Sequence, residues 1–263
     1  MGGTPTGFSI RRPDGIVSGT LLGTGPTTVF LHGWTLDGRM WRPQLGALPG
    51  RLLMLDRRGS GDSTAPAALD RELDDIDAVV DALGGRPVSL VGMSQGGRVA
   101  LRYAFSRPDR VSRLVLTGAP VDGSPFPPQS PIPIDVMRDL LDNGRLGELR
   151  ALWRMHPLMR FDQAEDLEHL LDGLLVECRW SELLASAALS RAPIDIFANV
   201  AGFSVPTLFL YGERDQPDLL TTARAVADRN PIMLFETIHD AGHFVNWTHA
   251  AAFNARLADF LAR

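Results

Sequence analysis

Lysine is absent from this 263-residue sequence, and all 26 basic residues are arginine. Without a lysine amine the chain cannot form a Schiff base with a carbonyl compound or use a serine–lysine pair. Cysteine is nearly absent too, because Cys178 stands alone. A single cysteine excludes an intrachain disulfide and a metal site built from cysteines. We interpret Cys178 as a partly buried free thiol in a helix.

Long apolar runs and an excess of positive charge are also missing. No stretch approaches the roughly 18 apolar residues of a membrane helix, and residues 1–15 contain no apolar core of the signal-peptide type. The formal net charge of −5 argues against a nucleic-acid partner. We therefore expect a cytoplasmic protein with neither a nucleic-acid nor a membrane partner. The oligomeric state is left open.

Short apolar strands alternate with helical segments along most of the chain. Strands are predicted at residues 8–12, 16–22, 27–31, 51–55, 88–91, 111–117, 207–211 and 233–238. Helices are predicted at residues 40–48, 69–83, 98–106, 219–227 and 249–261. Nearly continuous apolar strands in such an alternation are typical of a parallel sheet that helices bury on both faces. The sequence therefore predicts an α/β fold.

This alternation is interrupted in the middle of the chain. Residues 120–133 contain six prolines, which predicts a loop. Only helices are predicted after it, at residues 136–142, 146–155, 164–177 and 180–190, before the strand–helix pattern resumes at residue 206. The interruption is far longer than ordinary connections between strands. We predict an α/β core of residues 1–120 and 206–263, with residues 121–205 as a helical insertion.

The sequence Gly92-Met93-Ser94-Gln95-Gly96 lies between a predicted strand and a predicted helix. A serine at such a sharp turn is held in a strained backbone conformation and exposed above the end of the sheet. The flanking glycines let the strand and the helix approach each other. Ser94 is therefore a candidate nucleophile. The simpler interpretation is a serine that only occupies a tight turn.

A serine hydroxyl needs a base within hydrogen-bonding distance, and that base needs a group that orients it. Histidine suits the first role because its pKa lies near neutrality, and a carboxylate suits the second. His243 follows the last predicted strand and is the preferred base, with His239 as its competitor. Asp215 follows the preceding strand and is the preferred acid, with Asp122 as the alternative.

The order Ser94, Asp215, His243, together with the G-x-S-x-G turn, resembles the α/β-hydrolase family. The resemblance extends to His32-Gly33-Trp34, to residues 56–63 and to Ala241-Gly242-His243-Phe244. These details look most like the cofactor-free esterases and perhydrolases of the non-haem haloperoxidase-like branch. The resemblance implies a mostly parallel sheet of about eight strands with helices on both faces. The helical insertion is placed where this family has its cap.

The resemblance also implies roles for particular residues. The backbone N–H groups of Trp34 and Gln95 would form an oxyanion hole, whereas residues 56–63 are interpreted as a structural loop. No metal or organic cofactor is implied, and the expected ligand is a small ester-like molecule. We predict a serine hydrolase of carboxylic esters. The alternatives are a lactonase, a carbon–carbon bond hydrolase, an acyltransferase, and a non-catalytic ligand-binding protein of the same fold.

Overall fold

The computed structural model describes residues 4–161, 165–185 and 195–263. Within these residues one eight-stranded sheet forms, in the order β1-β2-β4-β3-β5-β6-β7-β8. Its strands are β1 (Thr6–Arg12), β2 (Gly15–Gly23), β3 (Thr27–Leu31), β4 (Arg51–Leu55), β5 (Val88–Met93), β6 (Val111–Thr117), β7 (Thr207–Gly212) and β8 (Met233–Ile238). All eight strands were predicted from the sequence.

Only β2 runs in the direction opposite to the other seven strands of the sheet. β1 pairs antiparallel with β2, and β2 pairs antiparallel with β4. Every other pairing, from β4–β3 through β7–β8, is parallel. The prediction of a mostly parallel sheet is therefore confirmed. Parallel strands point their carboxyl ends toward the same edge, so the loops that follow β3, β5, β6, β7 and β8 gather there.

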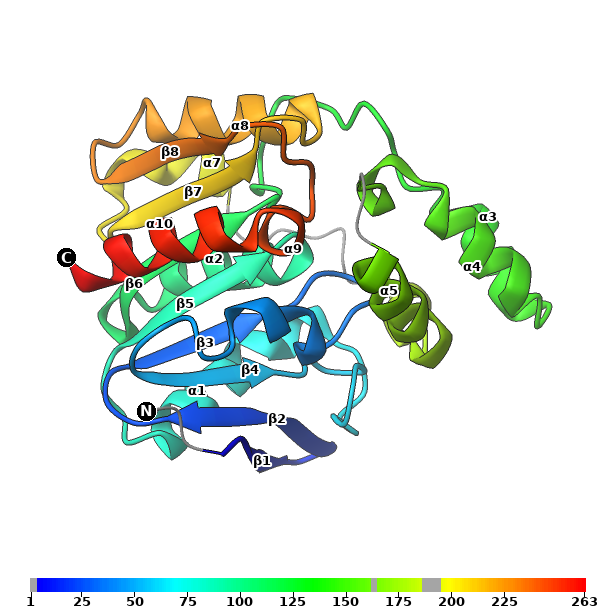
Figure 1. The fold of residues 1–263 in the computed structure, drawn as a ribbon, viewed down its shortest axis with the longest axis horizontal. Helices are drawn as coiled ribbons and strands as arrows, with labels where there is room; N and C mark the ends of the chain where they lie inside the picture. The colour runs from blue at the N-terminus through cyan, green and yellow to red at the C-terminus, as the bar shows by residue number, and fades with distance from the viewer. Residues whose placement is uncertain (1–3, 162–164, 186–194) are drawn as a thin grey trace.

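Helices cover both faces of the sheet (Figure 1). In β3, Val29 and Leu31 belong to one hydrophobic core, and Phe30 between them belongs to the other. This alternation follows from the period of two residues in a strand. The first core also contains side chains of α1 (Glu72–Ala82), α2 (Gln95–Ser106) and α8 (Pro217–Ala227). The second contains those of the 3₁₀ helix η1 (Gly38–Gln44) and of α10 (Ala250–Ala262).

The described residues between β6 and β7 contain helices and loops but no strand. The helices are α3 (Ile134–Asp142), α4 (Leu146–Arg154), α5 (Glu165–Glu177), α6 (Ser181–Leu184) and α7 (Ile196–Asn199). In Figure 1, α3, α4 and α5 lie to one side of the sheet, beyond the ends of its strands. Trp153 of α4 contacts Thr35 in the loop after β3, and Ser181 contacts Gly59 in the loop after β4. These helices therefore cover part of the carboxyl edge.

Several helix ends differ from the prediction. α2 begins at Gln95 rather than at residue 98, because the turn at Ser94 leads directly into the helix. The segment 69–83 starts with a 3₁₀ turn before α1, and η1 is a 3₁₀ helix that contains Pro43. A proline lacks the N–H that an α-helix interior requires.

The last predicted helix, at residues 249–261, is present as α10. A short helix that was not predicted, α9 (Val245–Thr248), precedes it, and His249 between the two has a non-helical backbone with φ of −125°. The helix predicted at residues 180–190 begins as α6, while residues 186–190 lie outside the described residues. None of the helices in the described part of the chain has the length and apolar character of a membrane span.

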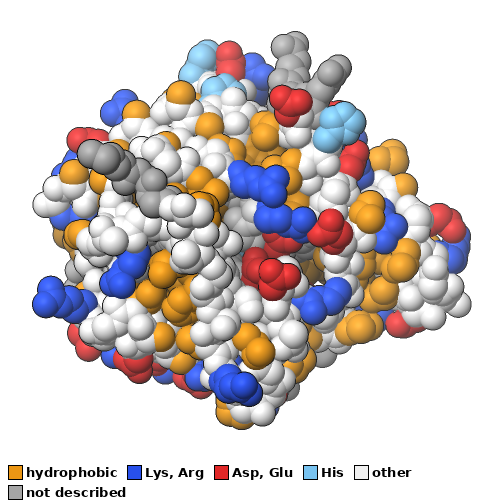
Figure 2. All heavy atoms as spheres, turned by 60° about the horizontal axis from the view of Figure 1, so that its bottom comes forward, with side chains coloured by type: hydrophobic (Ala, Val, Ile, Leu, Met, Phe, Trp, Pro, Cys, Tyr) orange, Lys and Arg blue, Asp and Glu red, His pale blue; other side chains and the backbone are white. Residues whose placement is uncertain are grey.

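Charges of both signs are mixed on the surface. On the face that Figure 2 shows, arginine and carboxylate side chains lie among apolar ones and do not form one large patch of a single sign. A basic stripe of the kind that binds a nucleic-acid backbone is not visible on this face.

Candidate active site

Ser94 occupies the sharp turn between β5 and α2. Its backbone has φ of 51° and ψ of −120°, a conformation that non-glycine residues rarely adopt. A side chain at Gly96 would place its Cβ 2.3 Å from the carbonyl oxygen of His32. A Cβ at Gly92 would lie 2.5 Å from the Cα of Gly97. Both glycines are therefore required for the strand and the helix to pack this closely around the serine.

Asp215 and His243 form a buried pair at the neighbouring strand ends. Asp215 follows β7 and His243 follows β8, and these two strands are adjacent in the sheet. Nδ1 of His243 lies 2.8 Å from Oδ1 of Asp215, and the two side chains are 5% and 1% exposed. A carboxylate can only accept this bond, so Nδ1 carries the proton and Nε2 is left as the basic nitrogen.

Asp215 is held in turn by the backbone. Its Oδ1 also accepts a 2.7 Å hydrogen bond from the N–H of Gln216. Gly118, after β6, lies directly behind the pair with φ of 54°, and a Cβ there would come within 2.4 Å of Cε1 of His243. Sequence reasoning missed Gly118. The only signal it offered was a glycine directly after a predicted strand.

The alternative acid and base are placed elsewhere. Asp122 is buried and forms ion pairs with Arg98 and Arg102, not with a histidine. His239 has a side chain that is 82% exposed, and its Nδ1 lies 2.6 Å from a carboxylate oxygen of Glu213.

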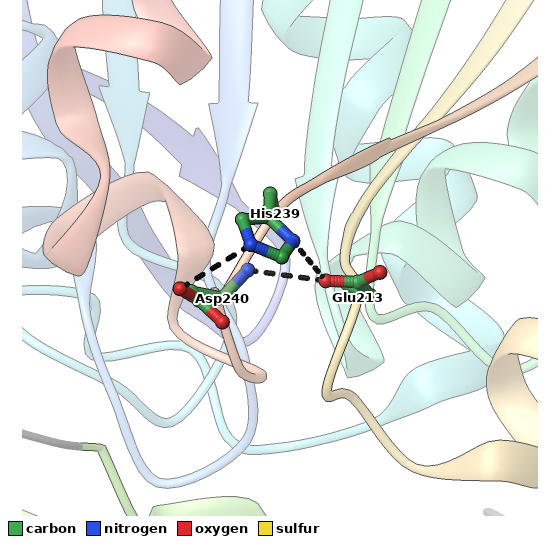
Figure 3. A group of neighbouring side chains, drawn as sticks. All are labelled: Glu213, His239 and Asp240. Atoms are coloured by element: carbon green, nitrogen blue, oxygen red, sulfur yellow. Dashed lines mark hydrogen bonds and ion pairs between the residues drawn. The ribbon is translucent and has the colours of Figure 1, made fainter.

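His239, Glu213 and Asp240 form an exposed cluster on the loops after β7 and β8 (Figure 3). Potential metal-ligand atoms of these three residues lie within 4.8 Å of one another. Asp240 is also paired with Arg214, and none of the three cluster residues lines the cavities next to Ser94. The cluster is a network of surface charges outside the site at Ser94.

His32 fixes the loop that carries Trp34. Nε2 of His32 accepts a 2.9 Å hydrogen bond from the N–H of Arg57, so the imidazole proton is on Nδ1 and is donated to the carbonyl of Gly33 at 2.8 Å. Burial is the main reason why the pKa of His32 falls to about 3, and the charge of Arg57 lowers it further. His32 is therefore neutral at pH 7 and serves as a fixed support.

The loop after β3 is also held by the helical segment. Thr35 has φ of 63°, and its hydroxyl donates to the carbonyl of Trp34 at 2.6 Å. The same oxygen accepts a 2.8 Å hydrogen bond from the indole N–H of Trp153. The rings of Trp34 and Trp153 pack edge to face with centroids 4.9 Å apart. This support of the Trp34 loop was not predicted.

The loop of residues 56–63 makes structural contacts, as expected from the sequence. Asp56 accepts hydrogen bonds from the N–H groups of Gly38 and Asp62 at 2.8 and 2.9 Å. The buried Arg57 pairs with Glu72 at 2.7 Å and with Glu182 of α6 at 2.8 Å. These charges connect the loop to α1 and to the helical segment.

Two cavities meet at Ser94. The larger has a volume of about 490 Å³ and the smaller about 30 Å³. Trp34 and Ser94 line both cavities, Gln95 lines the larger and His243 lines the smaller. Gln95 is the first residue of α2, and the N–H groups of the first helical turn have no acceptor within the helix. The residues predicted for a site at Ser94 are thus grouped around one position.

The chain belongs to the α/β hydrolase family, because a model of that family matches residues 28–256. It is similar to the 2-hydroxy-6-oxononadienedioate/2-hydroxy-6-oxononatrienedioate hydrolase 2 of Pseudomonas putida, with 28% identity over 91% of this chain and 89% of that one. It is also similar to the 2-hydroxy-6-oxo-6-phenylhexa-2,4-dienoate hydrolase of Burkholderia cepacia, with 26% identity over 91% and 89% of the two chains.

A similar fold is found in the bromoperoxidase of Bacillus anthracis. The two structures agree with a TM-score of 0.81 and 26% sequence identity, and the match covers 99% of this chain and 100% of the other. This similarity confirms the resemblance to the haloperoxidase-like branch that the sequence motifs indicated. The protein is therefore a member of the α/β hydrolase family, and its relatives are named for different activities.

Proposed function

We propose that this protein hydrolyses carboxylic esters, with Ser94 as the nucleophile, His243 as the general base and acid, and Asp215 as the carboxylate that orients His243. The proposal rests on the 2.8 Å hydrogen bond between Asp215 and His243, next to a serine with a strained backbone. Strain of this kind costs about 1–3 kcal/mol and is concentrated at functional sites.

In the first half of the reaction, Oγ of Ser94 bonds to the ester carbonyl carbon while Nε2 of His243 takes the hydroxyl proton. The carbonyl oxygen becomes an oxyanion, which the backbone N–H groups of Trp34 and Gln95 stabilise in our proposal. Each such donor contributes about 3–4 kcal/mol to the stability of the transition state. The carbon–oxygen bond to the alcohol then breaks, and the alcohol leaves with the proton from His243.

In the second half, a water molecule attacks the acyl-enzyme. His243 takes one proton from this water as its oxygen bonds to the carbonyl carbon, and a second oxyanion forms. The bond to Ser94 Oγ then breaks, and His243 returns the proton to the serine. The products are a carboxylic acid and an alcohol. We also propose that residues 121–205 act as a cap over a core of residues 1–120 and 206–263.

Carbon–carbon bond hydrolysis is the second candidate, because relatives with 26% and 28% identity are named for acidic dienoate and dienedioate substrates. The charge of the larger cavity favours the ester instead. Of the described residues that line it, Arg98 and Asp218 are charged, and Arg98 lies 2.6 Å from Asp122. The positive charge is offset, so a carboxylate substrate would gain little from it. A neutral ester needs no such charge.

The proposal is tested with p-nitrophenyl esters and a fluorophosphonate probe. We expect Ser94→Ala to lower kcat by about 10⁶-fold and to abolish labelling by the probe. Ser112→Ala is the matched control, because Ser112 is exposed near the start of β6. Ester turnover by Ser94→Ala at the wild-type rate would refute the assignment of Ser94 as the nucleophile.

Two other outcomes would favour a different function for the protein. A folded protein that is neither labelled nor active on esters would favour the non-catalytic ligand-binding alternative. Faster turnover of a 2-hydroxy-6-oxo-dienoate than of any ester, with the same dependence on Ser94, would favour carbon–carbon cleavage.

A further inference from the structure

The two cavities at Ser94 differ in volume by more than tenfold, about 490 Å³ against about 30 Å³. About 10–15 Å³ of cavity volume is enough for one water molecule. The smaller cavity therefore has room for about two or three groups of that size, such as a short alkyl chain. We call it the small chamber, and we call the other the large cavity. A substrate whose carbonyl carbon is at Ser94 must place one substituent in each.

The small chamber has apolar walls. Apart from Ser94 and His243, its lining consists of apolar residues and a glycine: Gly33, Trp34, Leu36, Met93, Ile132, Trp153, Leu158, Met159 and Phe244. Most of these side chains are buried, including Trp153, Met159 and Phe244. An alkyl group would gain from this environment, whereas a polar group would leave its hydrogen bonds in water unreplaced.

The walls of the small chamber are held in place from outside. Trp153 donates to Thr35 and stacks on His156 with ring centroids 5.0 Å apart. Phe244 packs against Phe161 and Trp247, with centroids 5.4 and 4.9 Å apart. Enlarging the chamber would disrupt these contacts, and close-packed interiors resist such changes. Its size therefore limits the substituent.

The large cavity has room for a bulky group. Its apolar lining includes Val121, Phe126, Ile132 and Leu219, and its one cation among the described residues, Arg98, is paired with Asp122. Leu158 and Ile132 line both cavities and stand between them. A flat, uncharged group such as a phenyl ring fits this combination of volume and surface.

The order of events in ester hydrolysis decides which substituent goes where. The alcohol must leave before water attacks, while the acyl group stays bonded to Ser94. A group that leaves needs the wider cavity, and a group that stays can occupy the small chamber. Resting on the proposed function, we infer that the substrates are short-chain acyl esters of bulky, uncharged alcohols or phenols. Leu158 and Met159 then set the limit on acyl length.

The first experiment compares substrates of the wild-type protein. Acyl length is varied from acetyl to octanoyl in p-nitrophenyl esters. We expect kcat/KM to be highest for acetyl or propanoyl and to fall by about tenfold for each further methylene that the chamber cannot hold. Phenyl acetate and methyl benzoate, which are isomers, exchange the small and the large substituent. After correction for their rates with hydroxide, we expect at least a tenfold preference for phenyl acetate.

The second experiment changes the wall of the chamber. Met159→Ala deepens the small chamber, and Leu158→Ala removes a side chain that stands between the small chamber and the large cavity. Both are expected to move the preferred acyl chain to about two or three more carbons while Tm shows that the protein is folded. Met155→Ala is the matched control, because Met155 is 68% exposed and lines neither cavity. It should leave the preference unchanged.

Failure of this inference differs from failure of the proposed function. A wild-type preference for hexanoyl or longer esters, or for methyl benzoate, would overturn the inference while ester hydrolysis by Ser94 stands. An unchanged preference in both wall variants would overturn the assignment of Leu158 and Met159. Absence of turnover and of labelling at Ser94 would refute the proposed function itself.

Discussion

The indole N–H of Trp153 donates a 2.8 Å hydrogen bond to the hydroxyl of Thr35, which joins α4 to the loop after β3. Thr35 has a left-handed backbone and directly follows Trp34, whose N–H is proposed to bind the oxyanion. The position of that N–H therefore depends on a residue of the helical segment more than a hundred positions away in the sequence. A cap of this kind would shape the catalytic loop as well as cover it.

Trp153→Phe should reduce activity while keeping most of the ring packing. The substitution leaves the Thr35 hydroxyl oxygen without its buried donor, which costs about 1–3 kcal/mol, and we expect kcat/KM to fall by about tenfold or more as the loop shifts. The control is Trp180→Phe, because the buried indole N–H of Trp180 has no hydrogen-bond partner among the described residues. Equal activities of the two variants would contradict this role.

Gly118→Ala should damage the site although it replaces no titratable residue. Its Cβ would lie 2.4 Å from Cε1 of His243, at a position where φ is already 54°. We expect kcat to fall by about 10²-fold because the imidazole is displaced. Gly147→Ala is the matched control, since a Cβ there meets nothing within 4 Å and Gly147 lies in α4. A wild-type kcat in Gly118→Ala would show that Gly118 does not determine the position of the Asp215–His243 pair.

Asp215→Asn should lower kcat by about 10⁴-fold, because an amide can stabilise the wrong tautomer of His243. Thermal unfolding would check that the variant is folded. Asp122→Asn tests the alternative acid, and it should reduce stability, because Asp122 pairs with Arg98 and Arg102. A larger loss of kcat in Asp122→Asn than in Asp215→Asn would reverse the assignment.

Glu182→Gln should change how stability depends on pH. Burial is the largest cause that raises the pKa of Glu182 to about 7 from its usual value of 4.5, and the charge of Glu72 adds to it, while Arg57 acts in the opposite direction. The folded protein thus binds this proton more tightly than the unfolded chain. The protonated Glu182 contributes up to about 3 kcal/mol to the free energy of unfolding. This contribution is complete below about pH 4.5 and is lost as the pH rises through about 7.

We therefore expect the Tm of the wild type to fall between about pH 4.5 and 7, and the Tm of Glu182→Gln to fall less. Differential scanning calorimetry across this range measures the effect. The neutral amide leaves the buried Arg57–Glu72 pair balanced. A parallel decline of both proteins would show that Glu182 does not control this pH dependence.

Other predictions from the sequence remain untested. The division into core and cap, the cytoplasmic location, and the absence of nucleic-acid and membrane partners stay predictions.

The sequence by itself determined the sheet and the positions of the functional loops. Short apolar segments such as Thr27–Leu31 are typical of buried strands, and their alternation with amphipathic helices allows few topologies. The turn at Ser94 was recognisable because its glycines are needed locally. The strands, the helices and the turn at Ser94 depend mainly on residues close together in the sequence, so they can be predicted without a structure.

Only the tertiary structure decided which side chains meet. It placed Asp215 rather than Asp122 beside His243, put Gly118 behind that pair, and joined Trp153 to Thr35. It also set the sizes of the two cavities, which segments far apart in the sequence line together. Contacts of this kind follow from the packing of whole elements against one another, and no local pattern in the sequence encodes their distances.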